Sequence, residues 1–195
     1  MLPVSPEELR HRNPRLTDVA QQRVREVLRP GSMAIDATMG NGHDTLFLAR
    51  AVSPGGRVMA FDVLETAVEN TRQRLLEARL DGVVTLWRTG HEHLAEHIPA
   101  TDHGQVDAVM FNLGYLPGSD KTVVTRADTT CQALSAATEI LAPCGILSVL
   151  LYRDHAEAAT EAVAVQRWLA ALPEPWTVEQ HDSAGPVFYL VKHAR

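Results

Sequence analysis

Residues 33–49 read Met33-Ala34-Ile35-Asp36-Ala37-Thr38-Met39-Gly40-Asn41-Gly42-His43-Asp44-Thr45-Leu46-Phe47-Leu48-Ala49. The stretch opens with an apolar run that ends at Asp36, continues as a loop with two glycines, and has a helical pattern from Asp44 onward. A strand, a glycine-containing loop and a helix in this order begin the Rossmann-like α/β folds, where the loop contacts a nucleotide-type cofactor. The stretch therefore predicts both a fold class and the place of a cofactor site.

Strands and helices continue to alternate along the rest of the chain. Further apolar runs that read as strands lie at residues 57–61, 83–87, 106–111 and 146–152. Helical patterns lie at residues 65–78, 128–141 and 155–171, and Pro143-Cys144-Gly145 reads as a turn. Apolar strands that alternate with helices indicate a parallel sheet covered on both faces.

Two final β-like segments, at residues 176–181 and 187–191, lack a helix between them. They can pair as a hairpin, which makes one strand of the sheet antiparallel. Five βα units closed by such a hairpin are the order of the class I methyltransferases. We therefore predict an α/β, Rossmann-like fold of this class, with a central seven-stranded, mostly parallel sheet, one antiparallel strand, and helices on both faces.

Length and composition set the outer limits of the prediction. The 195 residues fit one domain, residues 1–195, in which residues 1–30 are an N-terminal helical segment with Thr17 as the N-cap of a helix over about 18–29. We find no apolar run near the roughly 20 residues of a membrane span, and residues 1–8 do not resemble a signal peptide, so we expect a cytoplasmic protein.

Charge and cysteine content narrow the function classes. The net charge of −6 argues against a protein that holds nucleic acid through bulk charge, although a local basic patch is compatible with it. Cys131 and Cys144 are too far apart in sequence for a CxxC redox or zinc pair, so we expect both to be reduced.

The acidic residues around the glycine loop distinguish between two cofactors. Loops with two glycines occur in dinucleotide and S-adenosylmethionine sites alike, but here Thr45 stands where a dinucleotide loop usually has a third glycine. Asp36 and Asp44 flank the loop, where they would repel a pyrophosphate and attract the sulfonium and ammonium groups of S-adenosylmethionine. Asp62 can bind the ribose hydroxyls of either cofactor. The pattern favours S-adenosylmethionine, and capping of loop and helix is the alternative role for the two flanking carboxylates.

The loop after the fourth predicted strand reads Asn112-Leu113-Gly114-Tyr115-Leu116-Pro117-Gly118. Aminomethyltransferases commonly place Asn or Asp, then Pro-Pro and an aromatic residue, at this point. The carbonyl of an Asn side chain can accept a hydrogen bond from an amine, while an aromatic ring holds a flat substrate. The pattern therefore favours nitrogen as the methyl acceptor, with Asn112 and Tyr115 beside it. A turn in which Tyr115 serves only for packing is the alternative.

Four stretches carry a resemblance to a known family: residues 35–49 quoted above, Ala60-Phe61-Asp62, Gly90-His91-Glu92, and Met110-Phe111-Asn112-Leu113-Gly114-Tyr115-Leu116-Pro117-Gly118-Ser119-Asp120-Lys121. In them, and over about residues 17–193, the chain resembles the MnmM (YtqB-like) methyltransferases, long labelled rRNA methylases. The resemblance implies methylation, with S-adenosylmethionine as cofactor, of the aminomethyl group on the wobble uridine of certain tRNAs. It therefore implies the tRNA anticodon region as the partner.

The resemblance also implies roles for individual residues. The cofactor would contact Asp36, Thr38, Gly40, Asn41, Gly42, Asp44, Asp62, Val63, His91, Glu92 and Asn112. The substrate would contact Gly114, Tyr115, Lys121, Tyr152 and His155, with Asn112 and Tyr115 as the catalytic residues. The chain departs from the family at residues 152–155, where the family has Tyr-x-Gly-His, and at residues 183–186, where the family often has Asn followed by Pro-Pro. Both departures concern the substrate more than the cofactor.

Other interpretations stay open on the sequence alone. His91, His93 and His97 suggest a metal site, but the HExxH order is absent, so we expect no metal and place His93 and His97 in solvent. His155 fits a proton shuttle and a capping residue equally well. The rival functions are methylation of rRNA or of a small amine, and, less favoured, an NAD-dependent oxidoreductase or a nucleotide-binding module without chemistry. A homodimer is a further expectation, since it would help an acidic subunit to present a basic surface.

Overall fold

The computed structural model describes residues 15–114, 124–153 and 156–194. Its strands are β1 (Met33–Asp36), β2 (Arg57–Asp62), β3 (Val84–Arg88), β4 (Val106–Leu113), β5 (Leu141–Leu151), β6 (Trp176–Asp182) and β7 (Val187–His193). Its α-helices are α1 (Leu16–Arg25), α2 (His43–Val52), α3 (Glu65–Ala78), α4 (Ala127–Ile140) and α5 (Ala156–Ala170). Three 3-10 helices, η1 (Asp81–Val83), η2 (His91–His97) and η3 (Ala100–Asp102), complete the described elements.

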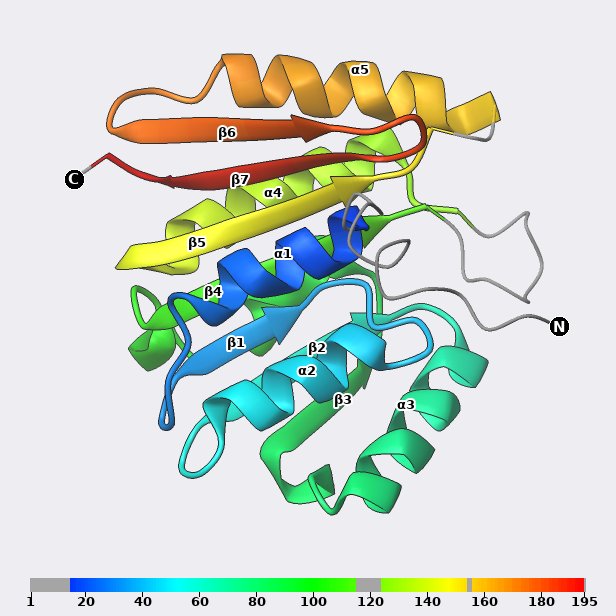
Figure 1. Ribbon diagram of the computed structural model, residues 1–195, viewed down its shortest axis with the longest axis vertical. Coiled ribbons are helices and arrows are strands. Elements are labelled where there is room, and N and C mark those ends of the chain that lie inside the picture. The colour runs from blue at the N-terminus through cyan, green and yellow to red at the C-terminus, as the bar shows by residue number, and fades with distance from the viewer. Residues whose placement is uncertain (1–14, 115–123, 154–155, 195) are drawn as a thin grey trace, which may run out of the picture.

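The strands form one sheet in the order β3-β2-β1-β4-β5-β7-β6 (Figure 1). β1 pairs in parallel with β2 and β4, and β7 pairs antiparallel with both β5 and β6. The predicted seven-stranded sheet with one antiparallel strand is therefore confirmed. β1 lies in the interior of the sheet, so the residues that follow it reach the middle of the sheet's carboxyl edge.

Helices cover both faces of the sheet, as predicted. In Figure 1, α1 and α2 lie in front of the sheet and α4 lies behind it. Successive strand residues face opposite sides, so Ala34 packs in the cluster that contains Val24 of α1 and Leu48 of α2, whereas Ile35 packs with Leu134 of α4. Each fully buried aliphatic side chain of this kind contributes about 1.5–3 kcal/mol, so the alternation in β1 fixes which face each helix covers.

The first helix differs from its prediction at both ends. It spans Leu16–Arg25 rather than 18–29, and its N-cap is Arg15, so Thr17 lies inside the helix. The backbone N–H groups of Val27 and Leu28 both donate to the carbonyl of Val24, at 3.2 and 3.3 Å, which closes the helix in a tight turn. The helix therefore ends at Arg25, before the predicted end at residue 29.

The fifth strand begins earlier than predicted, and the expected turn at Pro143-Cys144-Gly145 lies within it. Leu141 already pairs with Val106 of β4, but the next pair joins Ile146 to Ala108, so the intervening residues form an irregularity in the strand. A Cβ atom on Gly145 would lie 2.7 Å from the carbonyl oxygen of Val106. Glycine at this position thus marks a close approach of two strands rather than a chain reversal.

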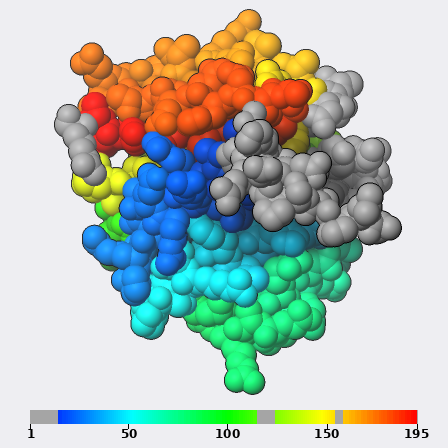
Figure 2. All heavy atoms as spheres, in the orientation of Figure 1, coloured from blue at the N-terminus to red at the C-terminus, as the bar shows by residue number. Residues whose placement is uncertain are grey.

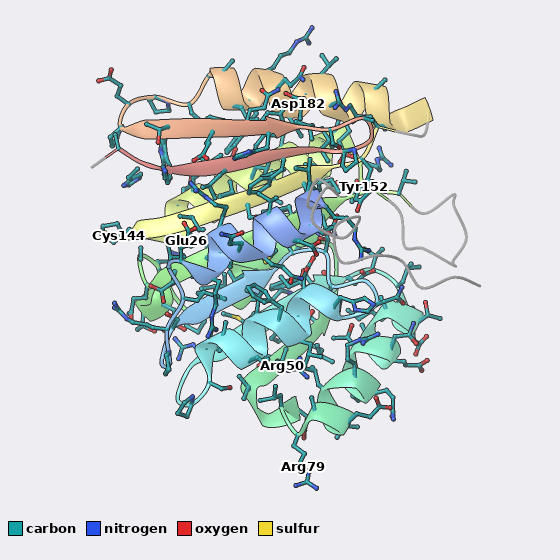
Figure 3. The ribbon with its side chains drawn as sticks, in the orientation of Figure 1. Glu26, Arg50, Arg79, Cys144, Tyr152 and Asp182 are labelled. Atoms are coloured by element: carbon teal, nitrogen blue, oxygen red, sulfur yellow. The ribbon has the colours of Figure 1, made fainter. Side chains whose placement is uncertain are left out.

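Both cysteines are free, as expected. Cys144 lies near the start of β5, and Tyr152 follows its other end, on the side where β1 and β4 also end (Figure 3). Among the described residues, none of the helices has the length and apolar content that a membrane crossing requires.

Candidate active site

A cavity of about 510 Å³ opens at the carboxyl edge of the sheet. Its lining comes from the segments after β1, β2, β3 and β4, from the start of α4, and from the residue after β5. Ligands of open α/β sheets bind at this edge. They bind where consecutive strands run outward in opposite directions, which here is between β1 and β4. The predicted residues Thr38, Gly40, Asn41, Asp44, Asp62, Val63, His91, Glu92, Asn112, Gly114 and Tyr152 all line the cavity.

The glycine loop is held in place by bonds within the protein. The N–H of Gly40 donates to a carboxylate oxygen of Asp62 at 3.0 Å, and the hydroxyl of Thr71 donates to the carbonyl of Gly40 at 3.2 Å. Gly42 has a φ of +76°, and a Cβ atom there would lie 2.9 Å from the Cα atom of Thr71. Only glycine satisfies both the backbone conformation and this contact, so the loop packs directly on α3.

Asp36 is a buried carboxylate that ends β1, with 1% of its surface exposed. One oxygen accepts the hydroxyl of Thr45 at 2.6 Å, and the other accepts the N–H of Thr38 at 3.2 Å. Burial, followed by repulsion from Asp44, raises the pKa of Asp36 to about 7, against the opposing effect of these hydrogen bonds. Two interacting carboxylates at one loop favour a cationic ligand, because a nearby positive charge would stabilise their ionised forms.

Asp62 ends β2 and faces the same loop. Its two oxygens accept the N–H groups of Leu64, at 2.9 Å, and Gly40, at 3.0 Å. Burial raises the pKa of Asp62, and these backbone hydrogen bonds oppose the rise. The carboxylate keeps unused lone pairs, which suits it to accept hydroxyl groups of a ribose.

Asn112, near the end of β4, combines a fixed backbone with an unpaired acceptor. Its N–H donates to the hydroxyl oxygen of Thr38 at 2.7 Å, and its side-chain Nδ2 donates to Asp44 at 3.4 Å. Its Oδ1 atom is buried and accepts no hydrogen bond from the described residues. A buried acceptor without a partner costs about 1–3 kcal/mol, and such atoms in native proteins often have a role toward a ligand.

Residues 90–92, after β3, form another wall of the cavity. The ring of His91 is buried edge-on against Phe111, with 5.7 Å between ring centroids, and burial lowers its pKa. The carboxylate of Glu92 lies against Gly90, where a Cβ atom would come within 2.5 Å of it. His91 therefore contributes a neutral, packed ring, whereas Glu92 contributes a carboxylate to the rim.

Two groups near the cavity were not predicted. Gln21 of α1 donates to Asp44 at 2.6 Å. Glu161 of α5, with 1% of its surface exposed, accepts the hydroxyls of Thr125 at 2.8 Å and Thr130 at 2.6 Å. No motif marks these residues, and the one sequence signal is that Glu161 is an acidic residue on the apolar face of its helix.

Other predicted features are resolved differently. Tyr115, Lys121 and His155 lie outside the described residues. His97 is stacked on Trp87, with 4.1 Å between ring centroids, so its predicted place in solvent was wrong. In the described part of the chain, no group of three or more His, Cys, Asp or Glu side chains is arranged to hold a metal ion.

The two departures from the family pattern contact each other. The guanidinium of Arg153 donates to the carbonyl oxygens of Gly185 at 3.2 Å and Ser183 at 3.4 Å, and lies 3.6 Å from the carboxylate of Asp182. Arg153 follows directly on Tyr152, which lines the cavity. The β6–β7 turn is therefore tied to the edge of the cavity by the residue that departs from the pattern.

Comparison with known proteins gives consistent matches. The model of the family described as "Putative rRNA methylase" matches residues 58–185. The chain is 37% identical over 165 residues to "tRNA (mnm(5)s(2)U34)-methyltransferase, chloroplastic" of Arabidopsis thaliana. That alignment covers 80% of this chain and 60% of the relative, so the chain spans about 60% of the relative's length.

Two solved structures match over the whole length of their chains. A "putative rRNA-methylase" from Clostridium thermocellum is 33% identical with a TM-score of 0.89, and the match covers 94% of this chain and 100% of that one. A "putative methyltransferase" from Streptococcus mutans, solved in complex with SAH, is 29% identical with a TM-score of 0.83 and the same two coverages. The fold is therefore that of the class I methyltransferases.

Proposed function

Because the chain belongs to the family described as "Putative rRNA methylase", we propose that it is an S-adenosylmethionine-dependent N-methyltransferase that acts on tRNA. Its acceptor is the aminomethyl group of the wobble uridine in the anticodon, which becomes 5-methylaminomethyl-(2-thio)uridine. The similarity to the chloroplastic relative, whose name specifies mnm(5)s(2)U34 in tRNA, supports this choice of substrate. The unpaired buried acceptor of Asn112 is the structural observation that carries it.

The residues of the cavity suit S-adenosylmethionine. Asp44 lines the cavity and Asp36 lies buried behind the loop, and both provide negative charge for the methionine end. Asp62 provides acceptors for the ribose. Val63, which is 51% exposed, and Glu92 border the remaining part of the cavity, where an adenine ring would lie. The SAH complex of the Streptococcus mutans protein supports the same cofactor. When bound, S-adenosylmethionine supplies an electrophilic methyl group.

Asn112 orients the acceptor nitrogen. An aliphatic amine is largely protonated at neutral pH and must lose a proton, here to solvent water, before its lone pair can react. The neutral primary amine keeps two N–H groups, and a hydrogen bond from one of them to Oδ1 of Asn112 would hold the lone pair toward the methyl group. The backbone of Asn112 is fixed by Thr38 and by its pairing with Leu150 of β5, so the geometry is built into the sheet. Tyr115 would hold the uracil ring from the following loop.

Methyl transfer to tRNA lacking the final methyl group tests the proposal. Wild-type protein with labelled S-adenosylmethionine should produce 5-methylaminomethyl-type uridine, detected by mass spectrometry of the nucleosides. Asn112→Ala should lower the transfer rate by roughly 10–100-fold, because it removes the acceptor for the amine, and should leave SAH affinity within about threefold. Label that appears in ribosomal RNA or in a small amine, and not in tRNA, would contradict the substrate.

A further inference from the structure

We propose that Gln21 of α1 is a positioning residue, which acts through Asp44 to set the orientation of the Asn112 side-chain amide. The inference rests on the proposed function, since it concerns the residue assigned to the acceptor amine. It adds α1, which lies before the region matched by the family model, to the parts of the chain that form the active site.

The carboxylate of Asp44 is held at both of its oxygens. Gln21 Nε2 donates to Oδ1 at 2.6 Å, and Asn112 Nδ2 donates to Oδ2 at 3.4 Å. The short bond to Gln21 fixes the plane of the carboxylate, and the longer bond to Asn112 depends on that plane. Such long bonds at active sites commonly tighten when the reactants are bound.

The contact with Asp44 decides which end of the Asn112 amide is left for the substrate. A carboxylate accepts hydrogen bonds, so the amide must turn its NH₂ group toward Asp44, and the reverse orientation would bring two oxygens together. Oδ1 then remains as the unpaired acceptor. If Asp44 could rotate freely, the amide would lose this constraint, and its carbonyl would be correctly placed for only part of the time.

A neutral amide is suited to this role. Asp44 and the buried Asp36 repel each other, and this repulsion contributes to the raised pKa of Asp36. The hydrogen bond from Gln21 holds one oxygen of Asp44 without placing a positive charge beside the carboxylate. An arginine or lysine in its place would neutralise the negative charge that the cationic cofactor requires.

Gln21 itself is held by the packing of α1. Ala20 and Val24 are buried on its inner face, and Arg23 forms an ion pair of 2.6 Å with Glu179 of β6. In Figure 2, α1 lies on the surface between α2 and the β6–β7 hairpin. The helix is thus fixed on both sides, so Gln21 is presented to Asp44 from a rigid element.

Single-turnover methyl transfer from labelled S-adenosylmethionine to tRNA tests the inference. Gln21→Leu keeps the size of the side chain and removes the donor, and Gln22→Leu is the matched control, because Gln22 is exposed on the same helix. We expect Gln21→Leu to lower the rate by about tenfold with SAH affinity within about threefold, and Gln22→Leu to leave both unchanged.

The same substitution in an Asn112→Ala background separates positioning from general damage. If Gln21 acts through Asn112, Gln21→Leu should lower the residual rate by less than about twofold in that background. An equal loss in both backgrounds, or no loss in the wild-type background, would overturn the inference. Gln21→Glu provides a second variant of similar shape, which repels Asp44 and should lower the rate at least as strongly.

A structural measurement keeps the inference testable if tRNA is not the substrate. In a crystal structure of Gln21→Leu, the Asp44 carboxylate should have turned out of reach of Asn112 Nδ2, because the 2.6 Å hydrogen bond that fixes its plane is lost. A carboxylate that keeps its wild-type orientation and its contact with Asn112 would overturn the link between Gln21 and Asp44. Absence of tRNA methylation by the wild type would instead count against the proposed function alone.

Discussion

At the scale of single residues, the proposed role of Asp36 in cofactor binding comes at the expense of stability. Its folded pKa of about 7 lies above the ordinary value of 3.8. Between those two values the folded chain holds a proton that the unfolded chain has released, so the free energy of unfolding falls as the pH rises through this window. A cationic cofactor reverses the preference, because it favours the ionised carboxylate.

Asp36→Asn should therefore change stability and binding in opposite directions. At pH 7.5 the melting temperature of the unliganded protein should rise by roughly 2–4 °C, because no buried charge has to form. Affinity for SAH should fall by roughly 10–100-fold, since the buried negative charge that attracts the ammonium through the loop is lost. Scanning calorimetry and titration calorimetry measure the two effects.

The pH dependence provides the control for Asp36. In the wild type, SAH affinity should rise by up to about tenfold per pH unit below pH 7 and level off above it. The slope should be smaller in Asp36→Asn. A wild-type affinity that is constant between pH 5.5 and 8 would contradict the assignment of this carboxylate to the methionine end.

At the scale of elements, Glu161 joins two helices to the cavity. Its oxygens accept hydroxyls from Thr125, which lines the cavity, and from Thr130 of α4. Thr130 Oγ1 also lies 3.5 Å from Nε2 of His91, and the N–H of Thr125 donates to the carbonyl of Gly114 at 3.0 Å. α5, far from the cofactor loop in sequence, thus supports the wall of the site.

Glu161→Ala should lower the free energy of unfolding by about 2–4 kcal/mol, because it leaves a cavity and deprives two hydroxyls of their acceptor. Chemical denaturation measures this loss. Glu139→Ala, at an exposed position of α4, is the control and should change stability by less than about 0.5 kcal/mol. Equal effects of the two substitutions would show that the buried carboxylate of Glu161 contributes no more to the free energy of unfolding than an exposed one does.

The sequence predicts elements better than it predicts their ends. The strand, loop and helix from Met33 onward could be identified because apolar periodicity, glycines and flanking carboxylates all agree there. Pro143 and Gly145 were interpreted as a turn, since the irregular pairing that accommodates them inside β5 depends on β4, which is distant in sequence. The partners of Gln21 and Glu161 could not be found for the same reason, because tertiary contacts set them and no local pattern names them.

At the scale of the whole molecule, the proposed tRNA substrate requires an acidic chain to bind RNA through local cations. The net charge is −6, and Arg126, at the start of α4, lines the cavity with a side chain that is 73% exposed. Its Nε atom lies 3.4 Å from the carboxylate of Asp128, which competes for the same guanidinium.

The expectations of a homodimer, of a cytoplasmic location, and of substrate contacts by Tyr115, Lys121 and His155 stay predictions.

The Arg126–Asp128 pair allows a test with opposite signs. Arg126→Ala should raise the KM for tRNA several-fold, because it removes a cation that can bind a phosphate group. Asp128→Ala should lower the KM, because it frees the Arg126 guanidinium from its ion pair. SAH affinity should stay within about twofold in both. Steady-state kinetics at two salt concentrations measures the effect, and a KM that responds equally to both substitutions would exclude this role for the pair.

The position of β7 has a consequence for biosynthesis. β7 is the last of the seven strands along the chain, yet it lies between β5 and β6, which are made before it. Translation proceeds at about 5–20 residues per second, so the apolar β5 has one unpaired edge for seconds before its neighbour emerges. Such an edge is a template for pairing with other chains. The yield of soluble protein should therefore depend more on how soon β7 is synthesised than on the free energy of unfolding of the complete protein.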